Sequence, residues 1–134
     1  MDWTLEVVVV PVSDVERAKR FYNEQLGFAV DTDYQPSESF RVVQLTPPGS
    51  GCSISIGVGL SQMAPGSLKG LQLCVSDIQA AHAALVARGV AVSPVRHFED
   101  GVAKDGPGGP WNSFIFFDDP DGNSWTVQEK PSRG

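Results

Sequence analysis

The sequence predicts an α+β protein built from two tandem copies of a strand–helix–three-strand unit, βαβββ. The tripeptide Val-Ser-Asp at 12–14 recurs at 75–77, and Gly27 recurs as Gly89 at nearly the same offset. A short apolar run precedes each Val-Ser-Asp, and a helical pattern follows it. The period is close to half of the 134 residues, so the repeat is a duplication rather than a solenoid.

The length and the repeat together set the expected boundaries. A chain of 134 residues is long enough for one domain with its own hydrophobic core. We therefore expect a single domain over 1–134. Its first module spans 1–58, a linker spans 59–69, and the second module spans 70–134.

Each copy carries a signal for the start of a helix. Ser13 with Glu16, and Ser76 with Gln79, fit the capping box, in which a serine caps the helix and the residue three positions later reaches back. We expect the two serines to be the N-caps. The repeated glycines should end both helices, because a left-handed residue is favoured there.

The segment after each helix is extended and interrupted by turn residues. The expected strands are 29–34, 40–45 and 52–58 in the first copy and 90–98, 113–117 and 124–129 in the second. The stretch 99–110 is rich in Gly and is expected to be a long, mobile loop.

Alternation along the strands separates an apolar face from a mildly polar one. Ser53 opposes Ile54 and Gln72 opposes Leu73, for example. The whole polar set is Ser53, Ser55, Gln72, Thr126 and Gln128. Such a face can line a ligand pocket or can simply be solvated, and the pattern alone leaves both interpretations open.

Composition excludes two classes of partner. The net charge is −6, with a pI near 4.7 and no basic stripe, which argues against nucleic-acid binding. The first apolar strand, 7–12, is far too short to span a membrane, and no signal-peptide pattern opens the sequence. Cys52 and Cys74 form no motif. We expect a cytoplasmic protein with two unpaired thiols.

Three segments together resemble one family. They are "VPVSDVERAKRFYNEQLGF" (10–28), "LCVSDIQAAHAALVARGV" (73–90) and "FFDDPDGNSWTVQE" (116–129). They resemble the glyoxalase/bleomycin-resistance (vicinal oxygen chelate) superfamily, and the whole chain is similar to glyoxalase-like proteins of the actinobacterial type. The resemblance implies a mixed sheet that curls around a cleft. It also implies a homodimer, since members with two modules per chain usually pair.

The resemblance also bears on metal binding. Metal-dependent members place a ligand at the start of the first strand of each module and a glutamate in the last strand. The matching positions here are Val7, Gly70 and Thr126, which do not supply a ligand set. We therefore expect no metal and no cofactor. The alternative is a divalent metal held by Glu6 or Glu129, if a β-bulge turns either one inward.

Several residues are candidates for ligand contact, each with a structural alternative. His97 is either an acid/base or hydrogen-bonding group or a structural histidine, and it is the one named catalytic candidate. Arg41 either clamps an anionic group or lies at a solvated edge. Trp111 and Phe114 either stack on a ligand or belong to the core. The full predicted set is Arg41, Gln44, Ser53, Gln72, His97, Trp111, Phe114, Thr126 and Gln128.

Two functions are compatible with these residues and with the resemblance. The first is metal-free binding of a small, partly aromatic or cationic molecule, in the manner of bleomycin-resistance proteins. The second is a lyase, isomerase or dioxygenase of the same superfamily that acts on a small oxygenated substrate. In a metal-dependent version the substrate's vicinal oxygens would chelate the ion, and in a metal-free version His97 or a glutamate would be the acid/base. The second rests on analogy alone.

Overall fold

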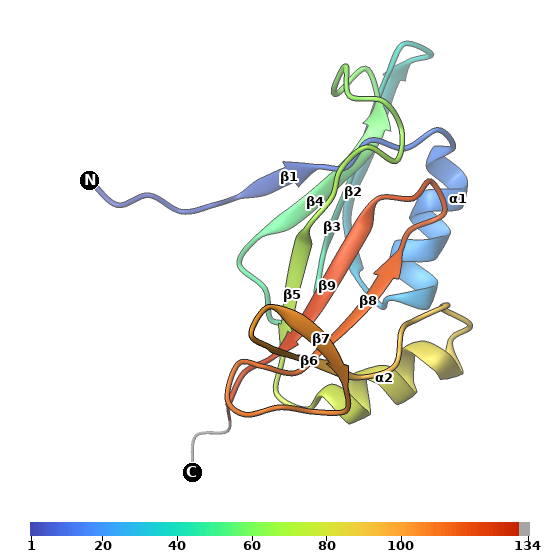
Figure 1. Cartoon of the computed structure of the whole chain (residues 1–134). Helices are drawn as coiled ribbons and strands as arrows, with labels where there is room; N and C mark the ends of the chain where they lie inside the picture. Colours follow the sequence, from blue (N-terminus) through green and yellow to red (C-terminus); the bar gives the residue numbers. More distant parts are fainter. Residues whose placement is uncertain (132–134) are drawn as a thin grey trace. The chain divides into compact units, whose positions relative to one another are not determined.

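The computed structural model describes residues 1–131 and contains two compact units. The first unit comprises Met1–Leu68 and Asp119–Asn123, and the second comprises Lys69–Asp118 and the residues from Ser124 onward. Each unit has one α-helix and one mixed sheet (Figure 1), so the predicted α+β class is confirmed. No helix among residues 1–131 is long and apolar enough to cross a membrane.

The first unit has the predicted order of elements. They are β1 (Val7–Val9), α1 (Val15–Arg20), β2 (Ala29–Ser37), β3 (Phe40–Thr46) and β4 (Ser53–Val58), with a π-helical turn (Phe21–Gln25) directly after α1. The sheet order is β1-β4-β3-β2, in which β1 pairs with β4 in parallel and the other pairs are antiparallel.

The second unit repeats this wiring with one added hairpin. Its elements are β5 (Leu71–Val75), α2 (Ile78–Ala87), β6 (Arg96–Glu99), β7 (Val102–Asp105), β8 (Phe114–Asp118) and β9 (Ser124–Glu129). The sheet order is β5-β9-β8-β6-β7, and β5 is parallel to β9 as β1 is to β4. The duplication seen in the sequence is therefore also a duplication of topology.

The two helices begin one residue later than predicted. The N-caps are Asp14, which accepts from the Arg17 N–H at 3.1 Å, and Asp77, which accepts from the Ala80 N–H at 3.0 Å. The predicted serine caps are therefore wrong. Aspartate and serine cap about equally well, and Ser13 instead donates its hydroxyl to Asp121.

The helix ends were predicted correctly. Gly27 and Gly89 have φ of 78° and 79°, the left-handed conformation expected at a helix C-terminus. In the first unit the π-helical turn precedes the glycine, and the Leu26 N–H donates to the Phe21 carbonyl. This wider turn carries Tyr22, whose side chain is fully buried.

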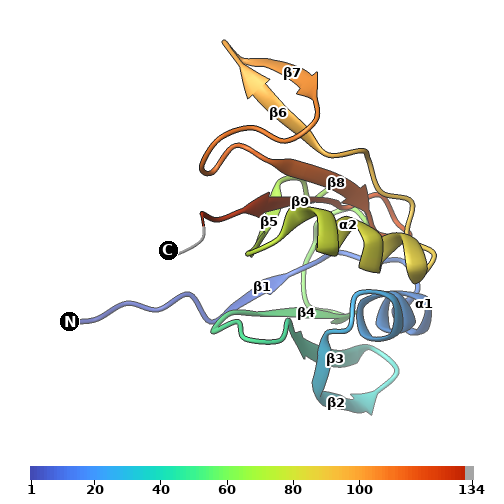
Figure 2. The ribbon, with the colours of Figure 1, turned by 90° about the horizontal axis from the view of Figure 1, so that it is seen from below.

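The segment 99–110 differs most from the prediction of a long loop. It contains β7, which pairs with β6 in a hairpin that Figure 2 shows clearly. The turn residues Asp100 and Gly101 both have positive φ, 52° and 78°, as a tight two-residue hairpin requires. The expected strand 90–98 is correspondingly shortened to β6, and only an isolated bridge from Val92 to Phe117 precedes it.

The apolar residues of each sheet form the core on one face. Val43, Leu45, Ile54 and Ile56 are buried in the first unit, and Ile115, Phe117, Trp125 and Val127 in the second. Most of these residues alternate with more polar ones along their strands, as the sequence pattern predicts, but Ile115 and Phe117 of β8 alternate with Phe114 and Phe116. Each helix also contributes apolar side chains, among them Ala18 and Ile78.

Candidate ligand-binding face

The sheet of the second unit presents one face that combines aromatic and amide side chains. Between β8 and β9, strand register places Phe114 opposite Gln128 and Phe116 opposite Thr126. Between β9 and its other neighbour, β5, it places Thr126 opposite Gln72. Partners in register project to the same side of a sheet. We call this side the aromatic–amide face and define it by Gln72, Cys74, Arg96, Phe98, Phe114, Phe116, Thr126 and Gln128.

Three phenylalanines form a continuous row on this face. The ring centroids of Phe98 and Phe114 lie 5.4 Å apart, edge to face, and those of Phe114 and Phe116 lie 6.2 Å apart and nearly parallel. Phe98 is exposed and the other two are half-buried. Exposed aromatic rings that already contact one another offer a platform for another planar group.

Two side-chain amides form a hydrogen-bonded chain beside the rings. Gln72 Nε2 donates to Gln128 Oε1 at 2.5 Å, and Gln128 Nε2 donates to the main-chain carbonyl of Trp111 at 2.8 Å. Trp111 itself is exposed and has a φ of 62°, which is uncommon for a residue other than glycine. Gln72, Gln128 and Trp111 all belong to the set of residues predicted to contact a ligand, and the structure brings the two side chains and the Trp111 backbone together.

The edge of the face is held by Asn112. Its Nδ2 donates to the Phe98 carbonyl, and its Oδ1 accepts from the Phe98 N–H, both at 2.9 Å. One side chain therefore replaces a strand partner for Phe98. Nearby, the Gly108 N–H donates to the buried Ser113 hydroxyl at 3.0 Å, which fixes the glycine-rich segment to β8.

His97 lies on the other side of its strand. Arg96 is in register with Phe114, so alternation along β6 places Phe98 with the aromatic row and His97 opposite. Its Nδ1 lies 2.8 Å from the Gly106 carbonyl and its Nε2 lies 3.1 Å from a Glu99 carboxylate oxygen. These contacts, first the carbonyl and then the carboxylate, raise the pKa of His97.

The carboxylate of Glu129, the alternative metal ligand, binds the first turn of a helix. It accepts from the Ile78 N–H at 2.8 Å, at the start of α2. The pairing of β5 with β9 runs without a break from Leu71 to Val75, so no bulge turns Glu129 toward the aromatic–amide face. No group of three or more His, Cys, Asp or Glu side chains suited to a metal occurs within residues 1–131.

The first unit contributes two predicted site residues to one face of its own sheet. Gln44 of β3 is in register with Ser55 of β4, and Ser53 lies two residues before Ser55 on β4, so it projects to the same face. The buried Ser53 hydroxyl lies 2.6 Å from the Thr46 hydroxyl, which also donates to the Asp31 carboxylate.

Arg41 takes part in an ion-pair cluster at the other face of the first sheet. Along β3 it projects to the same face as Val43 and to the opposite face from Gln44. Its guanidinium contacts the carboxylates of Glu16 in α1 at 2.6 Å and of Asp33 in β2 at 2.7 Å. Lys19 reaches Asp33 at 2.8 Å. The hydrogen bonds from Arg41 and then Lys19 hold the pKa of Asp33 well below its usual range. We therefore leave Arg41 out of the ligand-binding set.

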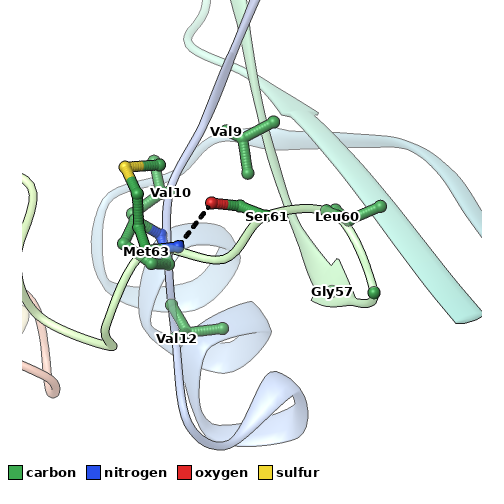
Figure 3. A pocket seen from close by; sticks show the side chains of 9 residues that line it. Val9, Val10, Val12, Gly57, Leu60, Ser61 and Met63 are labelled. Atoms are coloured by element: carbon green, nitrogen blue, oxygen red, sulfur yellow. Dashed lines mark hydrogen bonds between the residues drawn. The ribbon is translucent and has the colours of Figure 1, made fainter. Parts of the chain in front are cut away.

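The hollow shown in Figure 3 is too small to be a ligand site. Its volume is about 50 Å³, room for one or two waters. It is lined by β1, the following residues and the segment from Gly57 to Met63, where the Met63 N–H donates to the Ser61 hydroxyl at 2.9 Å. Drug-sized ligands need several hundred Å³.

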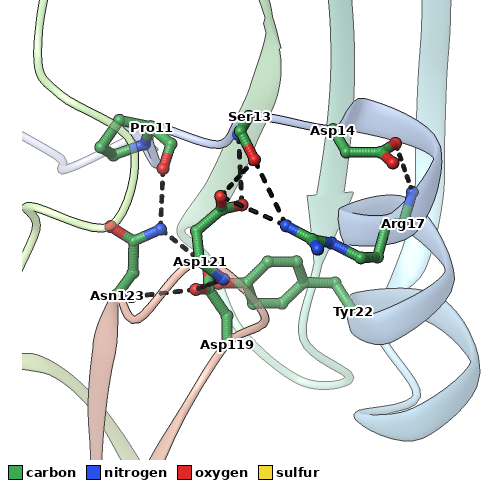
Figure 4. A network of polar contacts seen from close by, with 8 residues as sticks. All are labelled: Pro11, Ser13, Asp14, Arg17, Tyr22, Asp119, Asp121 and Asn123. Carbon is green, nitrogen blue, oxygen red and sulfur yellow. Dashed lines mark hydrogen bonds and ion pairs between the residues drawn. The ribbon is translucent and has the colours of Figure 1, made fainter.

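The Asp-Pro-Asp-Gly-Asn turn has a structural role within the first unit (Figure 4). The Tyr22 hydroxyl donates to Asp119 at 2.7 Å, and Asn123 Nδ2 donates to the Pro11 carbonyl at 2.8 Å. Ser13 donates to Asp121, which Arg17 also contacts at 3.3 Å. These contacts fix the turn to the segment before α1 and to the segment after it.

Comparison with known proteins decides the family. The profile "Glyoxalase/Bleomycin resistance protein/Dioxygenase superfamily" matches residues 4–127. The chain belongs to this superfamily. The resemblance seen in the three sequence segments is thus confirmed, while no curated protein matches significantly.

Solved structures of glyoxalase-superfamily proteins are similar over nearly the whole chain. TnmS3, described as an antibiotic binding protein from Streptomyces sp. CB03234, is 38% identical with a TM-score of 0.77, and the match covers 96% of this chain and 97% of that one. A glyoxalase/bleomycin resistance protein from the same organism is 39% identical, with coverage of 93% and 99% and a TM-score of 0.73. A superfamily member from Sphaerobacter thermophilus DSM 20745 is 29% identical, with coverage of 96% and 98% and a TM-score of 0.76.

Several residues near these faces were not predicted from the sequence. Cys74 could have been added to the predicted set, because it alternates with the apolar residues Leu73 and Val75. Phe116 was missed because the expected strand 113–117 was not divided into faces. Phe98 was missed because the extent of β6 was predicted incorrectly. Thr46 was missed because the expected strand 40–45 ended one residue too early. Asp31 was missed because a break in the β2–β3 register between Val30 and Thr32 is not visible in the sequence.

Proposed function

We propose that this glyoxalase-superfamily protein binds a small planar aromatic molecule on its aromatic–amide face and does so without a metal. The observation that carries the proposal is the row Phe98–Phe114–Phe116 beside the Gln72–Gln128 amide chain. Rings supply most of the affinity by stacking and desolvation, and a few amide groups orient the ligand.

The relatives support the same class of ligand. TnmS3 is described as an antibiotic binding protein, which supports a small-molecule ligand. The net charge of −6 modestly favours a cationic ligand through long-range attraction. The metal-free part of the proposal rests on Val7 and Gly70, whose side chains have no donor atoms at the family's ligand positions.

The enzymatic alternative has less support. It relies on His97 as acid/base, and alternation along β6 puts this side chain opposite Phe98. Turnover of a small oxygenated substrate that is lost in His97→Ala with binding retained would revive it. No contact among the described residues favours a lyase, isomerase or dioxygenase.

We also propose a cytoplasmic homodimer. Met1, Trp3 and Leu5 are exposed and alternate with polar residues along the extended segment before β1, a pattern typical of a strand that pairs with another chain. Two free cysteines fit a reducing compartment. Light scattering at micromolar concentration should give twice the mass of 14.4 kDa. A monomer would contradict the dimer.

The binding proposal is tested with 1-naphthol as a probe. Phe114→Ala should weaken 1-naphthol binding by about tenfold in a calorimetric titration, because it removes the central ring of the row. Phe40→Ala is the matched control, since it makes the same substitution at an exposed phenylalanine of β3 in the first unit. Equal loss in both variants, or no binding by the wild type, would overturn the proposal.

A further inference from the structure

The Trp111 carbonyl sets the direction of the amide chain. A main-chain carbonyl can only accept a hydrogen bond, so Gln128 must turn its NH₂ toward Trp111, at 2.8 Å. The Gln128 Oε1 then faces Gln72, and Gln72 must turn its own NH₂ toward that oxygen, at 2.5 Å. Neither amide can be flipped without placing two acceptors or two donors against each other.

The position of this carbonyl is itself fixed by the backbone. Trp111 has a left-handed φ of 62°, and the next residue, Asn112, is held at both ends. The Asn112 N–H donates to the Gly109 carbonyl at 3.0 Å, and its side chain makes two bonds to the Phe98 backbone. Rotating the Trp111 carbonyl away would break these contacts.

The hydrogen-bonded chain of amides therefore ends in an acceptor, the Oε1 of Gln72. Gln72 Oε1 has no hydrogen-bond partner among residues 1–131, and Gln72 is exposed. Donation by its NH₂ into a two-link chain polarises the amide and makes this oxygen a stronger acceptor. Register places Gln72, Thr126 and Phe116 in one row across the sheet, so the acceptor stands at the edge of the aromatic platform.

We infer that the aromatic–amide face selects aromatic ligands that carry a hydroxyl or N–H donor at the ring edge, with Gln72 Oε1 as the acceptor. The inference rests on the proposed binding function and specifies its ligand. Gln128 and the Trp111 carbonyl act as positioning groups that present this oxygen. The Thr126 hydroxyl can donate or accept, so it does not impose the same choice.

The test compares 1-naphthol with 1-methoxynaphthalene, in which a methyl group replaces the donor hydrogen of the hydroxyl. The protein should bind 1-naphthol about fivefold more tightly than 1-methoxynaphthalene in parallel titrations, the effect of one net hydrogen bond. Binding of neither probe would overturn the binding function itself. Equal binding of both would leave the binding function standing and overturn the donor selectivity.

Variants then assign the selectivity to the amide chain. Gln72→Met removes the acceptor, and the ratio of the two affinities should fall to about one. Gln79→Met is the matched control, because Gln79 is an exposed glutamine on α2, and it should keep the wild-type ratio. A ratio that persists in Gln72→Met would overturn the inference.

A double variant separates positioning from direct contact. Gln128→Met releases Gln72 from its fixed orientation and should reduce the ratio, although Gln128 does not contact the donor itself. Combining it with Gln72→Met should reduce the ratio no further than Gln72→Met alone, since both changes act through one oxygen. Strictly multiplicative effects would contradict the proposed chain.

Discussion

The hydroxyl of Tyr22 donates a hydrogen bond to the carboxylate of Asp119 at 2.7 Å, joining residues 97 positions apart within the first unit. Both side chains are buried. Asp119 also accepts from the N–H groups of Asp121 and Asn123. The Asp-Pro-Asp-Gly-Asn turn is thereby fixed to the segment that follows α1, although the strands on either side of it belong to the second unit.

Tyr22→Phe removes one donor to the buried Asp119 carboxylate. The free energy of unfolding should fall by roughly 2 kcal/mol, because a hydrogen bond to a charged group is lost. Urea denaturation measures this. Tyr34→Phe removes an identical hydroxyl from an exposed position on β2 and should change little. Equal effects of the two substitutions would show that the Asp119 contact is not stabilising.

Asp33→Asn should make the free energy of unfolding less dependent on pH in the acid range. The pKa of Asp33 is lowered in the folded state by Arg41 and Lys19, so its contribution is present above the unfolded pKa, near 4, and is lost as the pH falls through the folded pKa. The variant should lose about 1 kcal/mol at pH 6, with the difference from wild type shrinking toward pH 3.

The control for this pH dependence is Asp2→Asn in the exposed amino-terminal arm, which makes the same change of charge. Its stability should follow the wild-type curve in urea titrations at both pH values. A difference between Asp33→Asn and wild type that stays constant from pH 6 to pH 3 would contradict the ion-pair cluster as its source.

His97 should titrate above the usual pKa of histidine. The Gly106 carbonyl and the Glu99 carboxylate favour its protonated form, so the stabilisation they give is present below the unfolded pKa and is lost as the pH rises through the folded pKa. A proton NMR titration should show the raised midpoint, and Glu99→Gln should lower it. An unchanged midpoint in that variant would exclude the Glu99 contact.

Asn112→Ala should loosen the edge of the aromatic–amide face. It removes both side-chain bonds to the Phe98 backbone, each at 2.9 Å. The Phe98 amide should exchange with deuterium faster, by about tenfold or more, since its acceptor is lost. Hydrogen exchange followed by NMR measures this, with the Val127 amide in β9, an interior strand of the sheet, as internal reference. Unchanged exchange at Phe98 would contradict the role of Asn112.

The repeated topology could be predicted from sequence because both copies share local signals. Two apolar strands, two capped helices and two terminal glycines recur in the same order, and such signals act over short distances. The caps were misplaced by one residue because Ser and Asp stand side by side in both copies, and either can cap. In the first copy the Ser13 hydroxyl donates to Asp121, and Asp14 caps the helix.

The β6–β7 hairpin carried a local signal that was overlooked. Asp100-Gly101 is a typical two-residue hairpin turn, but the glycines that follow it made the whole segment look like a loop. For the candidate site, alternation predicted Gln72 and Gln128 on one face, whereas Phe114 was predicted only as an aromatic residue that could stack on a ligand. Strand register puts all three on the same side of the sheet. Alternation within β3 already places Arg41 and Gln44 on opposite faces, and this was overlooked when both were assigned to one site. The position of His97 depends on the extent and register of β6, which alternation within a single strand does not specify.

Cysteine reactivity reports whether a ligand covers the aromatic–amide face, because Cys74 is exposed on that face, in register with Gln128, and Cys52 lies in the first unit as an internal control. Alkylation by iodoacetamide is followed by mass spectrometry with and without saturating 1-naphthol. We expect 1-naphthol to slow alkylation of Cys74 and to leave the rate at Cys52 unchanged. An unchanged rate at Cys74 while 1-naphthol is bound would contradict binding on this face.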